Sequence, residues 1–213
     1  MHNFTQHTEI RNTPVDGLDS WTVLKGDQAW DGVLMGWVES NKAVWMAHTR
    51  GRKVVVQAGG CLGLYPRLFS QVFEHVYTFE PVPINFHCLV QNTQVENITK
   101  FNAGLGPKTG VASISSVNHS NPGLARATLN EEGTARTTMF ALDDLNLPGC
   151  DLIQLDVEGY ELDVLRGAIK TIERFRPAIS LERGNDTHLN FLSHWGYTQK
   201  ATTFDDVVYT TDK

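Results

Sequence analysis

The sequence has few cysteines, few basic residues and no long apolar segment. Its three cysteines, Cys61, Cys88 and Cys150, are far apart and form no CxxC pair, which argues against a disulfide framework and a cysteine-rich zinc site. Asp and Glu (24) outnumber Lys and Arg (18), giving a net charge of −6. The chain therefore lacks the basic field with which proteins attract nucleic acids and anionic membranes. No apolar run approaches the ~20 residues of a membrane span.

Taken together, these absences predict a protein of a reducing, cytoplasmic compartment that has neither a nucleic acid nor a membrane as its partner. Residues 1–14 are polar and contain no apolar core of a signal peptide. The 213 residues, of which 41% are hydrophobic and 20% charged, fit one compact domain, since domains typically hold roughly 100–200 residues. The sequence shows no internal repeat and indicates no particular oligomeric state.

From residue 53 onward, short apolar runs alternate with segments of helical periodicity. This alternation is typical of βα units and a mostly parallel sheet. The last two runs, 197–201 and 204–209, predict an antiparallel hairpin, so the sheet has seven strands in total. Ligands of such sheets bind beyond the carboxyl ends of the strands. The five predicted strands before the hairpin are 53–57, 75–79, a short strand ending near 101–102, 151–156 and 177–181.

Two segments fall outside the alternation. Residues 103–140 are rich in Ser, Asn, Gly and Thr, and we expect strands at 111–114 and 137–140 in a hairpin-like insertion, with a mobile loop at 115–133. Residues 1–50 hold four of the five tryptophans and predict a helical cap, whereas residues 51–213 form the ligand-binding part. The four are Trp21, Trp30, Trp37 and Trp45.

Glycines and an acid follow the first two predicted strands. Gly59, Gly60 and Gly63 come after the first strand, where glycine lets the backbone approach a ligand closely. Their spacing is GGxxG, so the dinucleotide pattern GxGxxG is absent. Glu80 ends the second strand, 17 residues after Gly63, at the place where an acid accepts hydrogen bonds from a ribose. Together these features indicate a cofactor that contains a nucleoside.

Carboxylates follow the fourth and fifth strands of the alternation. Asp156, Glu158 and Glu161 stand within six residues at the end of a buried strand, where unpaired acids are costly. Glu161 is suited to the first turn of the next helix, whereas Asp156 and Glu158 point to a functional site. Glu182 ends the fifth strand and is expected to converge on them. The histidines do not have the spacing of zinc ligands, so we assign no metal site. An alternative is a hard cation bound by carboxylate oxygens of Asp156 and Glu182.

The chain resembles the FkbM family of S-adenosylmethionine-dependent methyltransferases, which have a Rossmann-like class I methyltransferase fold and generally methylate oxygen. The resemblance covers about residues 50–210, and its most specific part is LDVEGYE followed by VLRGA. The motifs that carry it are VVQAGGCLG (55–63), TFEP (78–81), LDDL (142–145), LDVEGYE (155–161) and VLRGA (164–168).

The resemblance implies a role for each matching residue toward S-adenosylmethionine. Gly59, Gly60 and Gly63 would wrap the methionine part, and Glu80 would hold the ribose hydroxyls. Pro81 would border the adenine, whose amino group would meet Asn102. Asp156 would lie beside the methionine amine and the methyl group. In the order of the chain, the implied cofactor-binding residues are Gln57, Gly59, Gly60, Cys61, Gly63, Glu80, Pro81, Asn102 and Asp156.

Three positions depart from the family pattern. Gln57 replaces an aspartate, Cys61 replaces an asparagine, and Gln154 stands where the family often has lysine. Gln57 can still hydrogen-bond a methionine amine or a bridging water, but it adds no charge. Lower cofactor affinity is therefore expected unless another carboxylate supplies the missing charge.

The expected reaction is methyl transfer to a hydroxyl of a sugar, glycan or small metabolite. Such a hydroxyl must lose its proton to a positioned base, for which the candidates are Asp156, Glu158 and Glu182, with His119 less favoured. One alternative is a non-catalytic or weakly active S-adenosylmethionine-binding module with a tryptophan-rich partner surface. A nicotinamide-dependent oxidoreductase is a further alternative, which the missing GxGxxG pattern disfavours.

Overall fold

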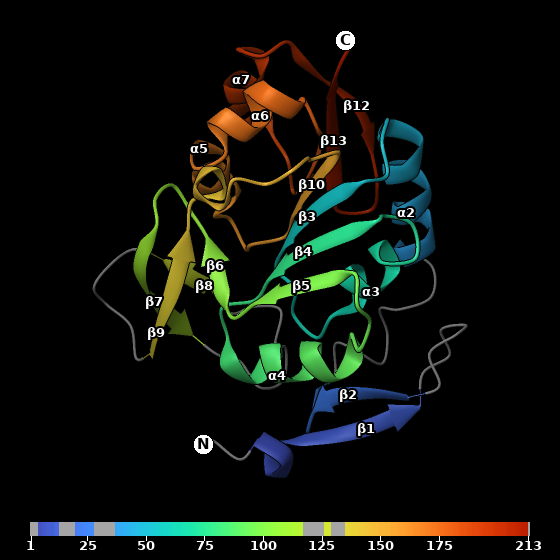
Figure 1. The fold of residues 1–213 in the computed structure, drawn as a ribbon, viewed down its shortest axis with the longest axis vertical. Helices are drawn as coiled ribbons and strands as arrows, with labels where there is room; N and C mark the ends of the chain where they lie inside the picture. Colours follow the sequence, from blue (N-terminus) through green and yellow to red (C-terminus); the bar gives the residue numbers. More distant parts are fainter. Residues whose placement is uncertain (1–3, 13–19, 28–36, 117–125, 129–134, 213) are drawn as a thin grey trace.

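A computed structural model of the chain describes residues 4–12, 20–27, 37–116, 126–128 and 135–212. Its centre is a seven-stranded sheet of order β12-β13-β11-β10-β3-β4-β5 (Figure 1). All neighbouring pairs are parallel except β11–β13 and β12–β13. This architecture confirms the predicted α/β fold with its terminal hairpin. The strands are β3 (Val54–Ala58), β4 (His75–Phe79), β5 (Ile98–Phe101), β10 (Leu152–Leu155), β11 (Ala178–Glu182), β12 (Tyr197–Thr202) and β13 (Asp206–Thr211).

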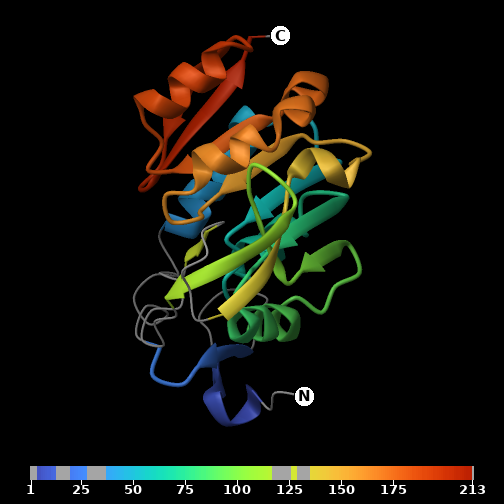
Figure 2. The same cartoon turned by 90° about the vertical axis from the view of Figure 1, so that its left-hand side faces the viewer.

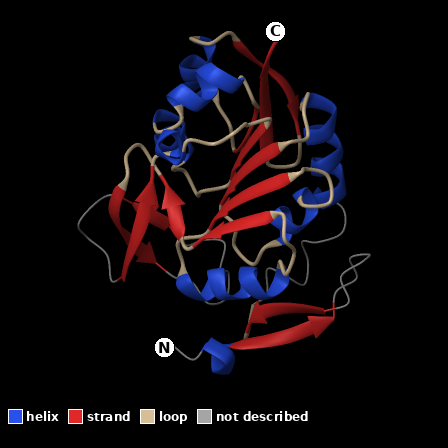
Figure 3. Cartoon of the chain, viewed as in Figure 1, coloured by secondary structure: helices blue, strands red, loops and turns tan. Residues whose placement is uncertain are grey.

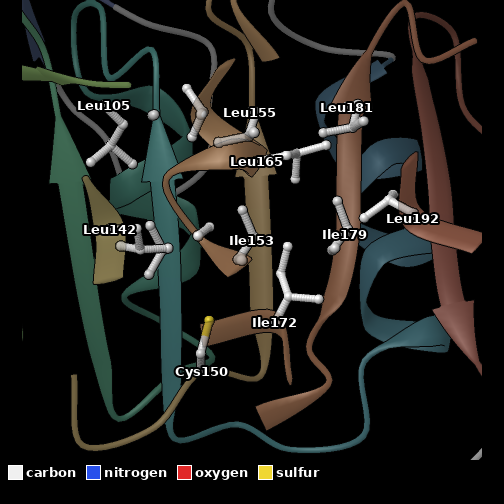
Figure 4. Packing of buried hydrophobic residues seen from close by; sticks show 14 of the residues in the cluster. Leu105, Leu142, Cys150, Ile153, Leu155, Leu165, Ile172, Ile179, Leu181 and Leu192 are labelled. Atoms are coloured by element: carbon white, nitrogen blue, oxygen red, sulfur yellow. The ribbon is translucent and has the colours of Figure 1, made fainter. Parts of the chain in front are cut away.

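The inner strands are buried on both faces, as expected of parallel strands covered by helices. All five residues of β3 and all four of β10 are buried. On one face, Ile153 and Leu181 pack with Leu165, Ile172 and Leu192 of three helices (Figure 4). Those helices are α5 (Glu161–Arg166), α6 (Ile169–Phe175) and α7 (Asp186–Ser193).

The opposite face of the sheet is covered by α2 (Trp37–His48) and α3 (Leu64–Phe69). Trp45 and Phe69 from these helices pack against Val55 and Leu152 of the sheet. Side chains alternate along a strand, so Gln57 in β3, Gln154 in β10 and Ser180 in β11 point to this second face. A third helix, α4 (Pro83–Asn92), follows β4.

Leu162, Leu165, Ile169 and Ile172 recur at helical spacing, which predicts one continuous helix, and this prediction was wrong. The segment folds as α5 and α6, which are interrupted at Gly167. A Cβ atom at Gly167 would lie 2.0 Å from the backbone oxygen of Gly106. The helix breaks there because a neighbouring loop packs directly against the backbone of this turn.

Residues 103–140 form a separate four-stranded sheet of order β6-β9-β7-β8 beside the carboxyl ends of the central strands (Figure 2). The predicted pairing of 111–114 with 137–140 is confirmed, since Val111 lies opposite Thr138 in an antiparallel pair. Most of the predicted loop 115–133, including His119, lies outside the described residues. The elements are β6 (Ala103–Leu105), β7 (Gly110–Ser116), β8 (Arg126–Thr128), β9 (Ala135–Phe140) and the 3-10 helix η3 (Leu142–Leu145).

The N-terminal segment is not the helical cap that the sequence predicted. It begins with the 3-10 helix η1 (Phe4–His7) and an antiparallel hairpin of β1 (Thr8–Asn12) and β2 (Ser20–Leu24) (Figure 3). Among the described residues of this segment, α2 is the α-helix that agrees with the predicted cap. Trp21 and Val23 alternate with polar residues in β2 and pack on Cys88 of α4, because period-two patterning favours a half-buried strand over a helix. No described helix has both the length and the apolarity needed to cross a bilayer.

Candidate functional site

The predicted site residues meet at one edge of the central sheet. Residue pairing places Ala58 beside both Phe79 and Leu155, and Leu155 beside Leu181. The glycine loop follows Ala58, Glu80 follows Phe79, and Asp156 follows Leu155. The sheet therefore brings together the three groups of residues that the sequence placed at strand ends.

The glycine loop is packed tightly between β4 and β10. Gly59 has a φ of +87°, and a Cβ atom there would lie 1.8 Å from the backbone oxygen of Asp156. The amide nitrogens of Gly59 and Gly60 both donate to the carbonyl of Phe79, at 3.1 and 2.9 Å. Gly63 also has a positive φ, of +97°, and precedes α3. Here glycine is required for a left-handed backbone and for close packing of one strand end on the next.

Glu80 holds the glycine loop to the segment after β4. Its side chain is 4% exposed, with Oε2 accepting from the Cys61 amide at 2.7 Å and Oε1 from the Val82 amide at 2.8 Å. Burial raises the pKa of Glu80 to about 7, although hydrogen bonds from Val82, Cys61 and Asn85 oppose this shift. The carboxyl is thus a buried acceptor surrounded by donors.

Asn102 and Pro81 border the same corner. Asn102 Nδ2 donates to the Glu80 backbone oxygen at 2.9 Å, which leaves the amide oxygen of Asn102 to accept from another group. Pro81 is partly buried. The ends of β4 and β5 are therefore fixed to each other beside Glu80.

Gln57 lies in strand β3, two residues before Gly59 of the glycine loop, and its side chain is completely buried. Its Oε1 accepts from Thr78 Oγ1 at 2.7 Å, and its Nε2 is buried with no hydrogen-bond partner among the described residues. An unsatisfied buried donor costs about 1–3 kcal/mol. A water molecule or a ligand oxygen is the kind of partner that would satisfy this donor.

Three carboxyl groups cluster at the ends of β10 and β11. Oxygens of Asp156, Glu158 and Glu182 all lie within 4.8 Å of one another. The pKa of Asp156 is well above its ordinary value, because of burial first and then the nearby charges of Glu182 and Asp206. Burial also raises the pKa of Glu182. Two buried carboxyl groups this close do not readily ionise together, so we expect the Asp156–Glu182 pair to hold one proton.

Arg183 and Glu161 support the carboxyl cluster. Arg183, which the sequence analysis missed, contacts Glu182 at 3.0 Å and Glu158 at 4.0 Å. Glu161 Oε1 accepts from the amides of Val157 and Gly159, both at 3.1 Å. Glu161 therefore shapes the loop after β10, in agreement with its predicted position in the first helical turn.

Three of the five described non-glycine residues with positive φ lie at the same edge, and the other two, Asn146 and Arg176, end helices elsewhere. Cys61, Glu158 and Arg183 have φ values of 44°, 57° and 49°, and each follows the end of a different strand. Residues other than glycine seldom adopt positive φ, at a cost of about 1–3 kcal/mol each. Such strain persists where the surrounding structure enforces it, and it gathers at functional sites.

A polar residue two positions before each acidic strand end is a signal that the sequence analysis did not use. Thr78 precedes Glu80, Gln154 precedes Asp156, and Ser180 precedes Glu182. All three polar side chains are completely buried, so their position below the acids reflects alternation along the strands. Asp206 was also missed, because it belongs to the terminal hairpin rather than to a βα unit.

The tryptophans of the first 50 residues do not provide a described partner surface. Trp21 and Trp45 are 1% and 0% exposed and belong to the core. Trp30 and the side chain of Trp37 lie outside the described part of the chain. The alternative of a tryptophan-rich binding surface is thus contradicted for the two tryptophans whose side chains are described.

Comparison with solved structures shows the class I methyltransferase fold. An FkbM methyltransferase from Methylobacillus flagellatus KT is 19% identical with a TM-score of 0.54, over 79% of this chain and 50% of that chain. The present chain thus spans half the length of that protein. A Clostridium thermocellum protein proposed to be an rRNA methylase is 8% identical with a TM-score of 0.50, over 83% and 95% of the two chains.

A third similar structure is M. jannaschii TYW2, solved in complex with AdoMet, which is 13% identical with a TM-score of 0.47, over 96% of this chain and 87% of that chain. Among curated proteins, none matches the sequence. The family model of the methyltransferase FkbM domain matches residues 68–199, which is more than half of the chain. The protein therefore belongs to the FkbM methyltransferase family, whose methyl donor is S-adenosylmethionine.

Proposed function

We propose that this protein transfers a methyl group from S-adenosylmethionine to a hydroxyl group of a sugar or another small metabolite. The observation that carries the proposal is the meeting, at one sheet edge, of a glycine loop held by a buried acid with the closely spaced carboxyl groups of Asp156 and Glu182. The first part suits a nucleoside-containing cofactor, and the second suits removal of a proton.

The residues at this edge fit the cofactor. Glu80 is a buried acceptor for ribose hydroxyls, and the free oxygen of Asn102 is an acceptor for an adenine amino group beside Pro81. The methionine part would follow Gly59, Gly60, Cys61 and Gly63. The unpartnered Gln57 Nε2 can donate to the methionine carboxylate or to a bridging water, which refines the contact with the amine expected from the sequence.

The acids of the site also match the charge of the cofactor. S-adenosylmethionine carries a positive sulfonium, and when bound it supplies an electrophilic methyl group. Asp156, Glu158 and Glu182 give this side of the edge a negative potential, which compensates for the aspartate that Gln57 replaces. An acid cluster favours a positive ligand over a neutral one.

The proposed site of proton transfer is the Asp156–Glu182 pair. In this proposal the proton of the pair is on Asp156, whose pKa is raised well above its ordinary value. An oxygen of Glu182 can then take the proton of an acceptor hydroxyl while Asp156 keeps its own. The deprotonated hydroxyl oxygen would then be the nucleophile toward the methyl group that the cofactor would supply, with the sulfur of the cofactor as the leaving group. Glu158 takes part by holding Arg183 beside Glu182.

The free state of all three cysteines supports a reducing, cytoplasmic location. We expect one compact domain in which residues 1–50 and 51–213 act together, since Trp45 lies in the sheet core. The acceptor is tested by incubating the protein with radiolabelled S-adenosylmethionine and panels of sugars, glycans and polyketide-like alcohols. Labelled product with a hydroxyl acceptor supports the proposal, whereas cofactor binding without transfer to any panel member favours the non-catalytic module.

A further inference from the structure

A third carboxyl lies in line with the Asp156–Glu182 pair. Glu182 of β11 lies directly opposite Asp206 of β13 in the antiparallel pairing, so their side chains point to the same face of the sheet. Residues directly opposite have Cβ atoms about 5 Å apart, and like charges there repel. Asp206 is 4% exposed, so water screens this repulsion poorly.

A buried chain of hydrogen bonds ends on Asp206. Trp45 Nε1 donates to Ser180 Oγ at 2.7 Å, and Ser180 Oγ is 2.7 Å from Asp206 Oδ2. The indole nitrogen is a donor only, and the serine hydroxyl has one hydrogen. Ser180 must therefore accept from Trp45 and donate to Asp206. A donor aimed at a carboxylate favours its ionised form, so the chain keeps the negative charge on Asp206.

Other influences around Asp206 shift its pKa in both directions. Burial raises the pKa of Asp206, and hydrogen bonding from Ser180, Gln154 and Trp45 opposes this. Gln154 lies close enough to lower the pKa, yet its amide makes no hydrogen bond of good geometry. We therefore regard Ser180 as the principal donor. Asp205, on the same strand connection, raises the pKa of Asp206 by its charge.

Charged groups on several neighbouring elements shift the pKa values of Asp156 and Glu182. Glu158 and Asp206 raise the pKa of Asp156. For Glu182, burial is the largest influence, Arg183 lowers the pKa, and Glu161 and Asp205 raise it. The ionisable groups of Cys61 and Tyr65 also lie within the influence of Asp156. Among these neighbours, Asp206 combines burial with a dedicated donor chain.

We propose that Asp206 is a positioning residue whose charge, held by Ser180 and Trp45, keeps one proton on the Asp156–Glu182 pair. Its importance for catalysis rests on the proposed methyl transfer. With one proton on the pair, held by Asp156, Glu182 stays ionised and one of its oxygens can act as the base. The inference also gives Trp45, a residue of the N-terminal segment, a function beyond packing.

The test is a titration of the carboxyl carbons by 13C NMR in the protein without cofactor or acceptor. In Asp206→Asn, loss of the neighbouring charge should lower the affinity of the pair for its last proton at least ten-fold. Ser180→Ala should change it in the same direction but less, because Asp206 then holds its charge less firmly. Asp205→Asn removes an equal charge from an exposed neighbour and is the matched control, for which a smaller change is expected.

The inference is overturned if Asp206→Asn titrates like the wild-type protein or changes the pair no more than Asp205→Asn does. Thermal unfolding establishes that each variant is folded. If Asp206→Asn does not fold, Trp45→Phe, which keeps a packed ring but removes the N–H, takes its place beside Ser180→Ala. A wild-type titration in both would equally contradict the inference. Because neither cofactor nor acceptor is present, this result is independent of whether methyl transfer is found.

Discussion

The candidate site has two halves, one at the end of β4 and one at the ends of β10 and β11. The buried carboxyl groups of these two halves have opposite surroundings. At the end of β4, Glu80 is surrounded by donors, and two backbone amides bind its oxygens at 2.7 and 2.8 Å. At the ends of β10 and β11, Asp156 and Glu182 meet each other and face further acids. Burial raises the pKa of all three, but donors oppose the shift at Glu80, whereas like charges strengthen it at Asp156.

This difference separates binding from chemistry. A carboxyl tied to backbone amides has a fixed position and serves as a stationary acceptor. A carboxyl that shares a proton with another is ready to exchange protons, as in other carboxyl pairs that cannot both ionise. We therefore assign the ribose contact of the cofactor to the Glu80 half and proton transfer to the Asp156–Glu182 half.

The strongest challenge to this division is the Glu182→Gln variant. Removing the base should reduce turnover by about 10²–10⁴-fold, which is the usual contribution of general-base catalysis. Binding of S-adenosylhomocysteine should weaken far less than turnover, because Glu182 contributes to cofactor binding only through the negative charge of the acid cluster. Both are measured with an acceptor found by the screen, and Glu96→Gln, an exposed acid, is the control. Normal turnover in Glu182→Gln would move the base elsewhere.

The glycine loop lies between the two halves, and we expect it not to tolerate one added methyl group at Gly59. Gly59→Ala places a Cβ atom 1.8 Å from the Asp156 backbone oxygen at a φ of +87°. We expect a loss of about 2–4 kcal/mol in the free energy of unfolding, from strain and steric overlap. Urea denaturation measures it.

Gly149→Ala is the matched control for this substitution. Its Cβ atom would meet Val54 Cγ2 at 3.6 Å, an ordinary contact, so its stability should change by less than about 1 kcal/mol. Equal effects of the two substitutions would show that Gly59 is not specially constrained.

The Glu80 half predicts a pH dependence of stability. The pKa of Glu80 is about 7, above its ordinary 4.5, so its contribution is fully present below pH 4.5 and is lost as the pH rises through 7. Relative to Glu80→Gln, the wild-type protein should lose about 3 kcal/mol of unfolding free energy across this window. Denaturation of both proteins at pH 4.5 and 8 measures the difference, and parallel behaviour would argue against a buried, titrating Glu80.

The strand ends were predictable from sequence because acids and glycines interrupt apolar runs there. Gly59, Glu80, Asp156 and Glu182 all lie at the predicted edge. Alternation within a strand also fixes which face a residue occupies, so Ser180 below Glu182 was open to prediction as well.

Contacts between elements distant in the sequence were not predictable in the same way. Asp206 reaches the site only because β13 pairs antiparallel with β11. Trp45 looked like part of a cap, and its bond to Ser180 spans 135 residues. The N-terminal hairpin was also missed, since a short strand with three buried residues resembles an amphipathic helix until its packing partner is known.

The central claim is that this edge binds S-adenosylmethionine through Glu80. Calorimetric titration with S-adenosylhomocysteine tests it directly and needs no acceptor. We predict binding to the wild-type protein, weakening by about 5–150-fold in Glu80→Ala, as expected when hydrogen bonds to a charged group worth about 1–3 kcal/mol are lost, and no binding of NAD. Binding of NAD without binding of S-adenosylhomocysteine, or an unchanged affinity in Glu80→Ala, would contradict the account.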